Sequence, residues 1–359
     1  MTRKEALITE TFAHLAMDTA CFFLLAGTFS QTAQTGLRIG AGYLLFALLS
    51  FGLRPLLGWF LDEFPKAHAQ AVGCLLAAIG GALPAGWSWG ALILTAVGSA
   101  VFHIGALGES LAFARGYFSR NGIFLAAGGF GASLGTVLAA GVKIPGWVFS
   151  LLLVLCALLC FFFGEARKYP RRIRSFRHSV SRKFPDWALL LLTLMPLLNA
   201  SLTVSLLPST WIKGSLILLP AGACLVGRVL GGVCADRFGP RKTAVLSFAV
   251  ATVMLTVFTH SPVGYCLGIA ALSAPISISY GTATAALPEK PHFAAGICSL
   301  VLLGGAIPGF FPITTGENAR FLCGILLVLS LGISLLLYTD HTRIFPWRKR
   351  PAKAKGEPR

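Results

Sequence analysis

The stretch GRVLGGVCADRFGPRK, residues 227–242, is the most informative part of the sequence and lies between two long apolar runs. Asp236 is followed at once by basic residues, and Gly239 among them permits a tight turn. A short, strongly basic turn between apolar runs is typical of a cytoplasmic loop that joins two membrane-spanning helices. The stretch therefore predicts a membrane protein whose helices turn back here.

Composition extends this prediction to the whole chain. Of the 359 residues, 55% are hydrophobic and only 12% are charged, and the mean hydropathy is +0.76. A soluble domain carries about 25% charged residues, so this chain has too few charges to cover a water-facing surface. Its apolar runs have the length that crosses a bilayer as a helix, about 20 residues. They lack the period-2 alternation of barrel strands, so their backbone groups must be satisfied within helices.

The apolar runs predict an all-α integral membrane protein with twelve transmembrane helices. Charged or turn-rich breaks delimit the runs 8–30, 38–61, 67–84, 88–113, 122–141, 146–164, 187–207, 214–235, 242–259, 262–286, 291–313 and 320–338. They leave no room for a folded soluble domain. Charged residues interrupt the first run too closely for a cleavable signal peptide.

Positive charge sets the predicted orientation. The net charge is +17, but the basic residues gather in short segments, above all 167–183 and 343–359, without the interleaved aromatic residues of a nucleic-acid surface. With the N-terminus inside, 26 of the 30 Lys and Arg residues, Arg54 and Arg228 among them, fall on the cytoplasmic side. The sequence thus predicts a multi-pass protein of the cell membrane with both termini in the cytoplasm and no nucleic-acid partner.

The chain also repeats itself. Two separate segments match identical residues at the same shift of 174 positions. In the first, Arg54, Gly58, Asp62 and Phe64 fall on Arg228, Gly232, Asp236 and Phe238. In the second, Gly131 and Gly135 fall on Gly305 and Gly309. An even number of helices between the copies predicts two parallel six-helix repeats. The expected units are a bundle at 1–164, a basic linker at 165–186, a second bundle at 187–340 and a basic tail at 341–359.

These residues resemble a family signature. Gly232, Asp236, Arg237, Gly239, Arg241 and Lys242 are in register with the cytoplasmic G-x-x-x-D-R-x-G-x-R-K signature of the major facilitator superfamily. The first copy, with Arg54, Gly58 and Asp62, is degenerate because Glu63 and Pro65 replace a basic residue and a glycine. The resemblance implies the major facilitator fold and a signature that clamps the halves together. Asp236 is expected to face the N-terminus of the helix that begins near His292; the alternative is a plain basic loop.

The glycines of the repeat have two interpretations. Gly131 and Gly135, like Gly305 and Gly309, lie four residues apart, which permits close helix contact. The family resemblance implies that these two helices lie between the halves and bend during transport. Tight packing alone explains the spacing equally well.

Ionisable residues within the apolar runs are the strongest indication of function, since each is costly in a membrane. Glu10, His14 and Asp18 share one face of the first helix, and His103 and Glu109 lie on the fourth. Helical rise places Asp18 and His103 at the same depth, about 15 Å. A His beside a carboxylate suits a proton carrier. A structural hydrogen-bonded pair, with Glu10 merely interfacial, is the alternative.

The second half offers only uncharged polar residues at the corresponding helices. Asn199, Ser277 and Tyr280 are candidates to donate hydrogen bonds to a substrate. Because the first, fourth, seventh and tenth helices contain no buried Lys or Arg, a neutral or cationic solute is expected.

A narrower resemblance concerns the first half alone. His14-Leu-Ala-Met-Asp18, with Phe102-His103-Ile104, resembles the fosmidomycin-resistance subgroup of the superfamily. Ile104 stands where the subgroup has proline, and Thr136 stands in place of part of a G-P pair. These departures bear on the substrate more than on the architecture.

The predicted function is secondary transport of a small organic solute by alternating access, as proton-coupled efflux. One alternative is a membrane acyltransferase, because His14 and Asp18 also spell an H-x-x-x-D signature; another is a transporter-like sensor that no longer cycles. No P-loop, dinucleotide fingerprint or metal-ligand cluster is present in the sequence, so no cofactor or metal is expected. The expected partners are a small-molecule substrate, protons and the lipid bilayer, and the protein is expected to be monomeric.

Overall fold

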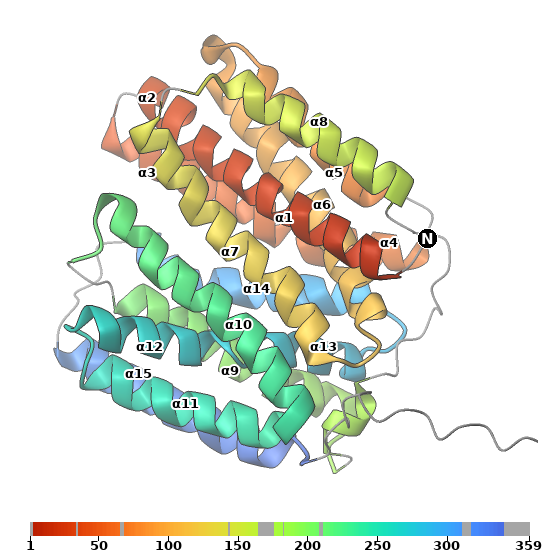
Figure 1. Ribbon diagram of the computed structural model, residues 1–359, viewed down its shortest axis with the longest axis vertical. Helices are drawn as coiled ribbons and strands as arrows, with labels where there is room; N and C mark the ends of the chain where they lie inside the picture. Colours follow the sequence, from red (N-terminus) through yellow and green to blue (C-terminus); the bar gives the residue numbers. More distant parts are fainter. Residues whose placement is uncertain are drawn as a thin grey trace, which may run out of the picture.

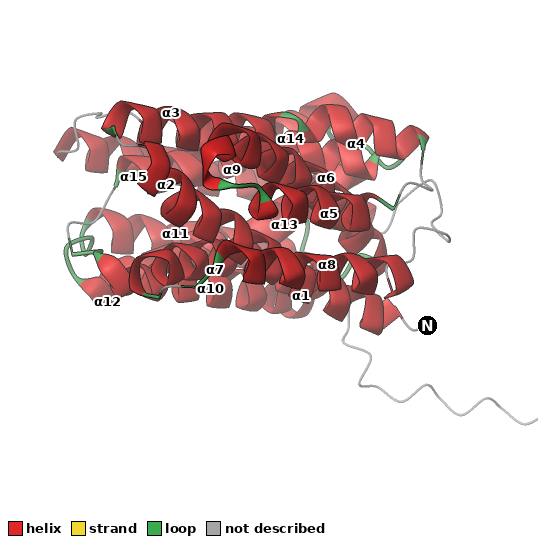
Figure 2. Ribbon diagram, turned by 90° about the horizontal axis from the view of Figure 1, so that it is seen from above, coloured by secondary structure: helices red, strands yellow, loops and turns green. Residues whose placement is uncertain are grey.

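The computed structural model describes residues 3–33, 35–64, 68–142, 144–163, 176–181, 183–207, 211–310 and 317–340 (Figure 1). The predicted tail at 341–359 and most of the predicted linker lie outside the described residues. Apart from one isolated bridge between Val180 and Tyr338, the described residues form only helices and their connections (Figure 2). The predicted all-helical class is confirmed.

The first half of the chain contains eight α-helical segments. In chain order these are α1 (Arg3–Leu24), α2 (Ser30–Ala33), α3 (Gly36–Ala47), α4 (Arg54–Glu63), α5 (Ala69–Ala82), α6 (Ser88–Ala114), α7 (Phe118–Gly141) and α8 (Gly146–Phe163). Single π-turns at Leu25–Phe29 and Leu48–Gly52 join α1 to α2 and link α3 to the region of α4. Each predicted span in this half therefore coincides with a helical segment.

The second half contains seven α-helical segments. They are α9 (Asp186–Leu206), α10 (Leu218–Phe238), α11 (Pro240–Thr256), α12 (Pro262–Ser273), α13 (Ile276–Ala286), α14 (Pro291–Ala306) and α15 (Glu317–Leu337). Pro275 separates α12 from α13 within one predicted span, because proline removes a backbone donor from the helix.

Ten helical segments of the described residues are long and apolar enough to cross a membrane. The remaining predicted spans, 67–84 and 242–259, correspond to α5 and α11, with 14 and 17 residues. A membrane crossing needs about 20 residues, so the count of twelve stays a prediction. Large apolar side chains on the outer face of α8, such as Leu151 and Phe162, are exposed, as expected of a lipid-facing helix.

Close packing between distant helices fixes the centre of the molecule. α1 lies along α7, and α5 lies between α6 and α8 (Figure 1). The two most extensive contacts between the first half and the second are those of α4 with α14 and of α7 with α10. Asp62 and Asp236 lie at the ends of α4 and α10 where these contacts are tightest, and we call this end of the molecule the Asp62/Asp236 end.

Candidate functional site

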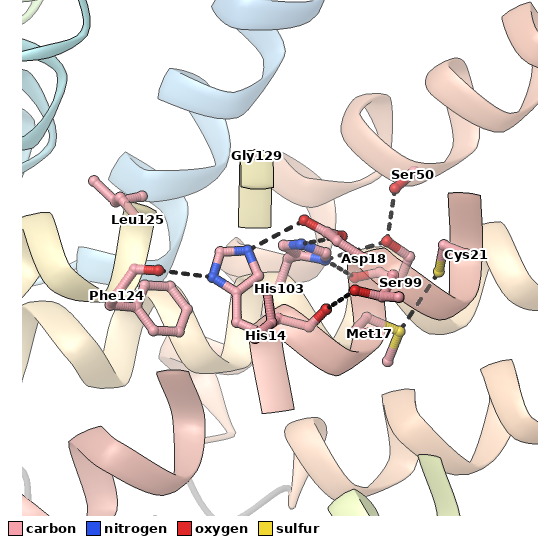
Figure 3. A network of polar contacts seen from close by, with 12 residues as sticks. His14, Met17, Asp18, Cys21, Ser50, Ser99, His103, Phe124, Leu125 and Gly129 are labelled. Atoms are coloured by element: carbon pink, nitrogen blue, oxygen red, sulfur yellow. Dashed lines mark hydrogen bonds and ion pairs between the residues drawn. The ribbon is translucent and has the colours of Figure 1, made fainter. Parts of the chain in front are cut away.

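Asp18 lies between two histidines at the centre of the first half (Figure 3). Its Oδ1 is 3.1 Å from His103 Nε2, and its Oδ2 is 3.5 Å from His14 Nε2. His14 and Asp18 are one turn apart on α1, whereas His103 comes from α6. The side chain of Asp18 is 15% exposed and both histidines are buried. The structure thus brings together the residues that helical rise placed at one depth.

Hydrogen bonds on the far side of each ring orient the two histidines. Since a carbonyl oxygen only accepts, His14 Nδ1–H donates to Phe124 O at 3.0 Å and His103 Nδ1–H donates to Ser99 O at 2.7 Å. Each Nε2 is thereby left facing Asp18. An ionised Asp18 and two neutral rings would set lone pairs against a carboxylate, so the cluster as arranged requires an additional proton near Asp18.

Glycines on α7 allow α1 to approach this closely. A Cβ on Gly128 would overlap His14 Nε2 and Asp18 Oδ2, and one on Gly131 would lie 2.6 Å from Leu15 O. Gly135 abuts Thr19 of α1 in the same way. Gly131 and Gly135 therefore pack against α1 within the first half. Their structural neighbours favour the tight-packing interpretation.

The second pair of repeat glycines packs against α9. A Cβ on Gly305 would lie 2.5 Å from Ser201 Cβ, and one on Gly309 would lie 3.6 Å from Ser205 Oγ. Ser201 and Ser205 also donate hydrogen bonds to backbone oxygens of α14, at Leu302 and Gly305. The close contact of α9 and α14 corresponds to that of α1 and α7.

Glu10 and Glu109 form a second cluster of ionisable groups. Both are buried, and Glu10 lies beside Glu109 and Gln70. Neither carboxylate oxygen of Glu10 has a hydrogen-bond partner among the described residues, and Glu109 Oε2 also has none. Glu10 is covered because α5, α6 and α8 pack against α1, and the alternative that it is interfacial stays a prediction.

Arg54 and Arg228, which were counted with the cytoplasmic charges, lie on α4 and α10. Arg54 and Arg228 are each eight residues before the aspartate in the last turn of their helix, about 12 Å along its axis. Arg54 is only 4% exposed. Both residues fall within the predicted spans 38–61 and 214–235, and the structure shows that their guanidinium groups are held in contacts between helices.

The surroundings of the arginines are related by the 174-residue shift. Arg54 Nη1 donates to Ser299 Oγ at 3.3 Å, and Arg228 Nη1 donates to the backbone oxygen of Leu125, the residue 174 positions earlier than Ser299. Likewise Gly296 packs on the Arg54 carbonyl and Gly122 on the Arg228 carbonyl. The repeat seen in the sequence thus recurs in the contacts.

The signature aspartates cap helices, but not as expected. Asp236 accepts hydrogen bonds from Phe118 N at 2.8 Å and Ser119 N at 3.0 Å, so it caps α7. The prediction that Asp236 faces the helix beginning near His292 was wrong. Asp62 has that position: it accepts from His292 N at 3.1 Å, Phe293 N at 2.9 Å and His292 Nδ1 at 2.7 Å.

The same 174-residue shift relates these two caps, because it carries Phe118 onto His292. Gly58 and Gly232 lie beneath them: a Cβ on Gly58 would be 2.5 Å from His292 O, and one on Gly232 would be 2.6 Å from Phe118 O. The degenerate first copy of the signature therefore retains its cap and its close helix contact.

The basic residues of the signature lie at the surface of the same end. Arg241 forms an exposed ion pair with Asp340 at 3.4 Å, and the Arg237 guanidinium lies over the Phe238 ring. Lys242 is exposed. Gly239 adopts φ +96°, a conformation that other residues rarely adopt, and so forms the turn expected of it.

The substrate candidates of the second half have different surroundings. Tyr280 is buried with its hydroxyl 3.3 Å from Ser299 Oγ, and Ser277 is buried on the face of α13 near Gly122. Asn199, in contrast, donates to Leu326 O and Ser330 Oγ of α15. The prediction that Asn199 faces a substrate was wrong, because a buried amide needs partners and finds them on α15.

His14, Asp18 and His103 also satisfy the geometry of a metal site, since their ligand atoms lie within 4.8 Å of one another. The expectation of no metal remains a prediction. The acyltransferase interpretation of His14 and Asp18 has lost its basis, because the His14 ring is stacked on Phe124 and both residues are occupied in the cluster with His103.

Solved structures show which fold this is. The crystal structure of a single-residue variant of the E. coli fucose:proton symporter FucP matches with a TM-score of 0.67 at 15% identity, covering 92% of this chain and 97% of that one. A second FucP structure, described as a major facilitator superfamily transporter in the outward conformation, matches with a TM-score of 0.57 at 13% identity, covering 90% and 98%. The chain has the fold of the major facilitator superfamily.

A curated relative narrows the comparison. The fosmidomycin resistance protein of Escherichia coli (strain K12) is 36% identical over 126 residues, which are 32% of this chain and 30% of that protein. The match thus spans less than a third of the relative's length. No family model matches the chain. The solved structures that it resembles are described as those of transporters.

Proposed function

We propose that this protein is a secondary transporter that moves a small organic solute by alternating access, in the direction of proton-coupled efflux. The major facilitator fold supports transport. The relative named for fosmidomycin resistance supports export, since export of a toxic compound confers resistance. A symporter among the structural neighbours is consistent with protons as the coupling ion.

The proposed architecture is two six-helix repeats, 1–164 and 187–340, joined by the linker 165–186 and followed by the tail 341–359. It is supported by contacts that recur in both halves at a shift of 174 residues. These are the helix caps made by Asp62 and Asp236 and the hydrogen bonds donated by Arg54 and Arg228. In this proposal α5 and α11 complete twelve spans, both termini lie in the cytoplasm of a monomer, and the Asp62/Asp236 end is the cytoplasmic one.

The observation that carries the proposal is the position of Asp18 between two histidine Nε2 atoms whose Nδ1 atoms already donate to carbonyls. One proton shared between Asp18 Oδ1 and His103 Nε2 satisfies the shorter of the two contacts, and its loss sets lone pairs against each other there as well. The cluster therefore binds a proton in this conformation and releases it when the helices separate. Glu10 and Glu109, two carboxyl groups buried beside each other, supply a second candidate proton site.

Transport in proteoliposomes with an imposed pH gradient tests the proposal, with a panel of small organic solutes that includes fosmidomycin. Asp18→Asn is expected to abolish pH-driven flux while membrane insertion and the elution volume of the purified protein stay unchanged. Asp186→Asn is the matched control, because Asp186 is 59% exposed and forms a surface ion pair with Arg177.

Two results would contradict the proposal. Normal pH-driven flux by Asp18→Asn would remove Asp18 from the coupling mechanism. Solute binding without any flux by the unmodified protein would favour the non-cycling sensor. The helix cap that Asp62 retains is an argument against the sensor, because the first copy of the signature still joins two helices.

A further inference from the structure

We propose that His14, Asp18 and His103 form a binding site for a divalent transition-metal ion of the zinc class, which takes the place of the coupling proton. The site itself rests on the geometry of the described residues, and only its effect on flux rests on the proposed transport function. It replaces the expectation, drawn from the sequence, that no metal is bound.

The ligand atoms have the separations of a small metal centre (Figure 3). Asp18 Oδ1 is 3.1 Å from His103 Nε2, Asp18 Oδ2 is 3.5 Å from His14 Nε2, and the ligand atoms of the three residues lie within 4.8 Å of one another. Around a tetrahedral zinc ion with bonds of about 2.0–2.1 Å, neighbouring ligand atoms are about 3.3–3.4 Å apart. The two histidine–carboxylate separations bracket this value. The two rings therefore need to approach each other by at most about 1.4 Å to complete the site.

The backbone holds both imidazole rings in the orientation of metal ligands. His14 Nδ1–H donates to Phe124 O and His103 Nδ1–H donates to Ser99 O, so each Nε2 faces Asp18. Histidines that ligate a metal almost always donate their other N–H to a carbonyl or a carboxylate in this way. This is independent evidence for the site, because it concerns the side of each ring that faces away from Asp18.

A dication satisfies this cluster more completely than a proton does. A shared proton joins Asp18 Oδ1 to His103 Nε2 and leaves His14 Nε2 opposite a carboxylate oxygen without a hydrogen between them. A metal ion accepts lone pairs from both rings and from the carboxylate at once. The charge of Asp18 also offsets half of the charge of the ion.

The chemistry of the three ligands selects the ion. Imidazole nitrogen suits zinc, nickel and copper, whereas magnesium and calcium prefer oxygen ligands. The side chain of Asp18 is 15% exposed, which leaves the site accessible. Arg54 lies within electrostatic range of Asp18 and His103. Because its charge opposes a bound cation, we expect a dissociation constant in roughly the micromolar range.

Metal binding joins two helices. His14 and Asp18 lie on α1 and His103 lies on α6, so one ion ligated by all three residues holds α1 against α6. It also occupies the atoms that bind the coupling proton under the proposed function. Zinc is therefore expected to stabilise this conformation against thermal unfolding and to inhibit pH-driven flux until a chelator removes it.

Zinc binding to the purified, untagged protein tests the site without requiring transport. Titration calorimetry is expected to show a zinc ion that excess magnesium or calcium does not displace. His14→Gln and His103→Gln are each expected to weaken its binding at least about 10-fold, whereas His260→Gln, which changes an exposed histidine, is expected to leave it unchanged. X-ray absorption at the zinc edge needs no variant. It is expected to show nitrogen and oxygen neighbours at about 2.0–2.1 Å and no sulfur at about 2.3 Å.

The outcomes separate the metal site from the transport function. Sulfur neighbours, displacement of zinc by magnesium, or unchanged zinc affinity in both histidine variants would overturn the inference. So would pH-driven flux that saturating zinc leaves unchanged, because metal and proton would then not share one site. Zinc bound through both histidines in a protein that shows no pH-driven flux would uphold the metal site and refute the proposed transport function.

Discussion

Replacing Asp62 by alanine is expected to loosen both helix contacts at the Asp62/Asp236 end, not only the one that Asp62 makes. Asp62 is 4% exposed and accepts three hydrogen bonds from the first residues of α14. Its charge also faces the positive end of that helix. Under the proposed function, this cap and that of Asp236 stabilise the same closed arrangement.

The size of the effect follows from these contacts. Hydrogen bonds to a charged, buried acceptor contribute about 1.5–3 kcal/mol, in the range expected when an N-cap and its charge are removed together. Opening of the closed end should therefore become roughly 10- to 150-fold more frequent. The neighbouring Glu63→Ala is the control: Glu63 is 50% exposed, its ion pair with Lys290 is 3.5 Å long, and such surface pairs contribute at most about 1 kcal/mol.

Hydrogen–deuterium exchange of the purified protein measures this opening directly. In Asp62→Ala, the amides of His292 and Phe293 lose their acceptor and exchange faster in any case. The informative amides are those of Phe118 and Ser119, which are bonded to the untouched Asp236. Faster exchange there shows that both contacts open as one unit. If these two amides keep the exchange rate of the unmodified protein, the idea of a shared closed state is wrong.

Two further substitutions give opposite outcomes for transport and stability. Gly128→Ala places a methyl group against His14 and Asp18 and should lower pH-driven flux at least about 10-fold. Gly129→Ala is the control, because its methyl group would lie 3.5 Å from Arg228 and should be tolerated. Equal flux in the two variants would contradict this prediction. Asn199→Ala removes the hydrogen bonds to α15 and should lower the free energy of unfolding by about 1–3 kcal/mol. Thermal unfolding measures this loss, and the solute panel is expected to show the same transported solutes. A changed solute preference would restore Asn199 to the substrate site.

The helices and the central proton cluster could be predicted because both depend on distances along a single helix. Apolar length sets where a membrane helix runs, and a fixed rise per residue sets the depth of each side chain. Asp18 and His103 were placed at one depth by such counts, and their atoms meet at 3.1 Å. The second histidine, His14, joined them because positions four apart share a helix face.

Contacts between helices could not be predicted in the same way, because they depend on which helices are neighbours. The sequence identified Asp236 as a helix-capping residue but not that α7, rather than α14, is the helix beside it. Arg54 and Arg228 were counted with the charges of the cytoplasmic side, and only the α4–α14 and α7–α10 contacts show which residues they bind. Asn199 was misassigned because its partner helix, α15, comes more than one hundred residues later.

The symmetric and asymmetric features of the centre fit two separate tasks. The arginines and their acceptors recur at a shift of 174 residues. The same shift carries Ser50 and Ser99, whose side chains are in hydrogen-bond contact, onto Cys224 and Ser273, whose side chains are also in contact. The same shift carries His103 onto Ser277, which cannot carry a proton at neutral pH. Under the proposed function, the repeated contacts serve both halves alike, whereas the coupling proton needs only one site, the histidine–aspartate cluster of the first half.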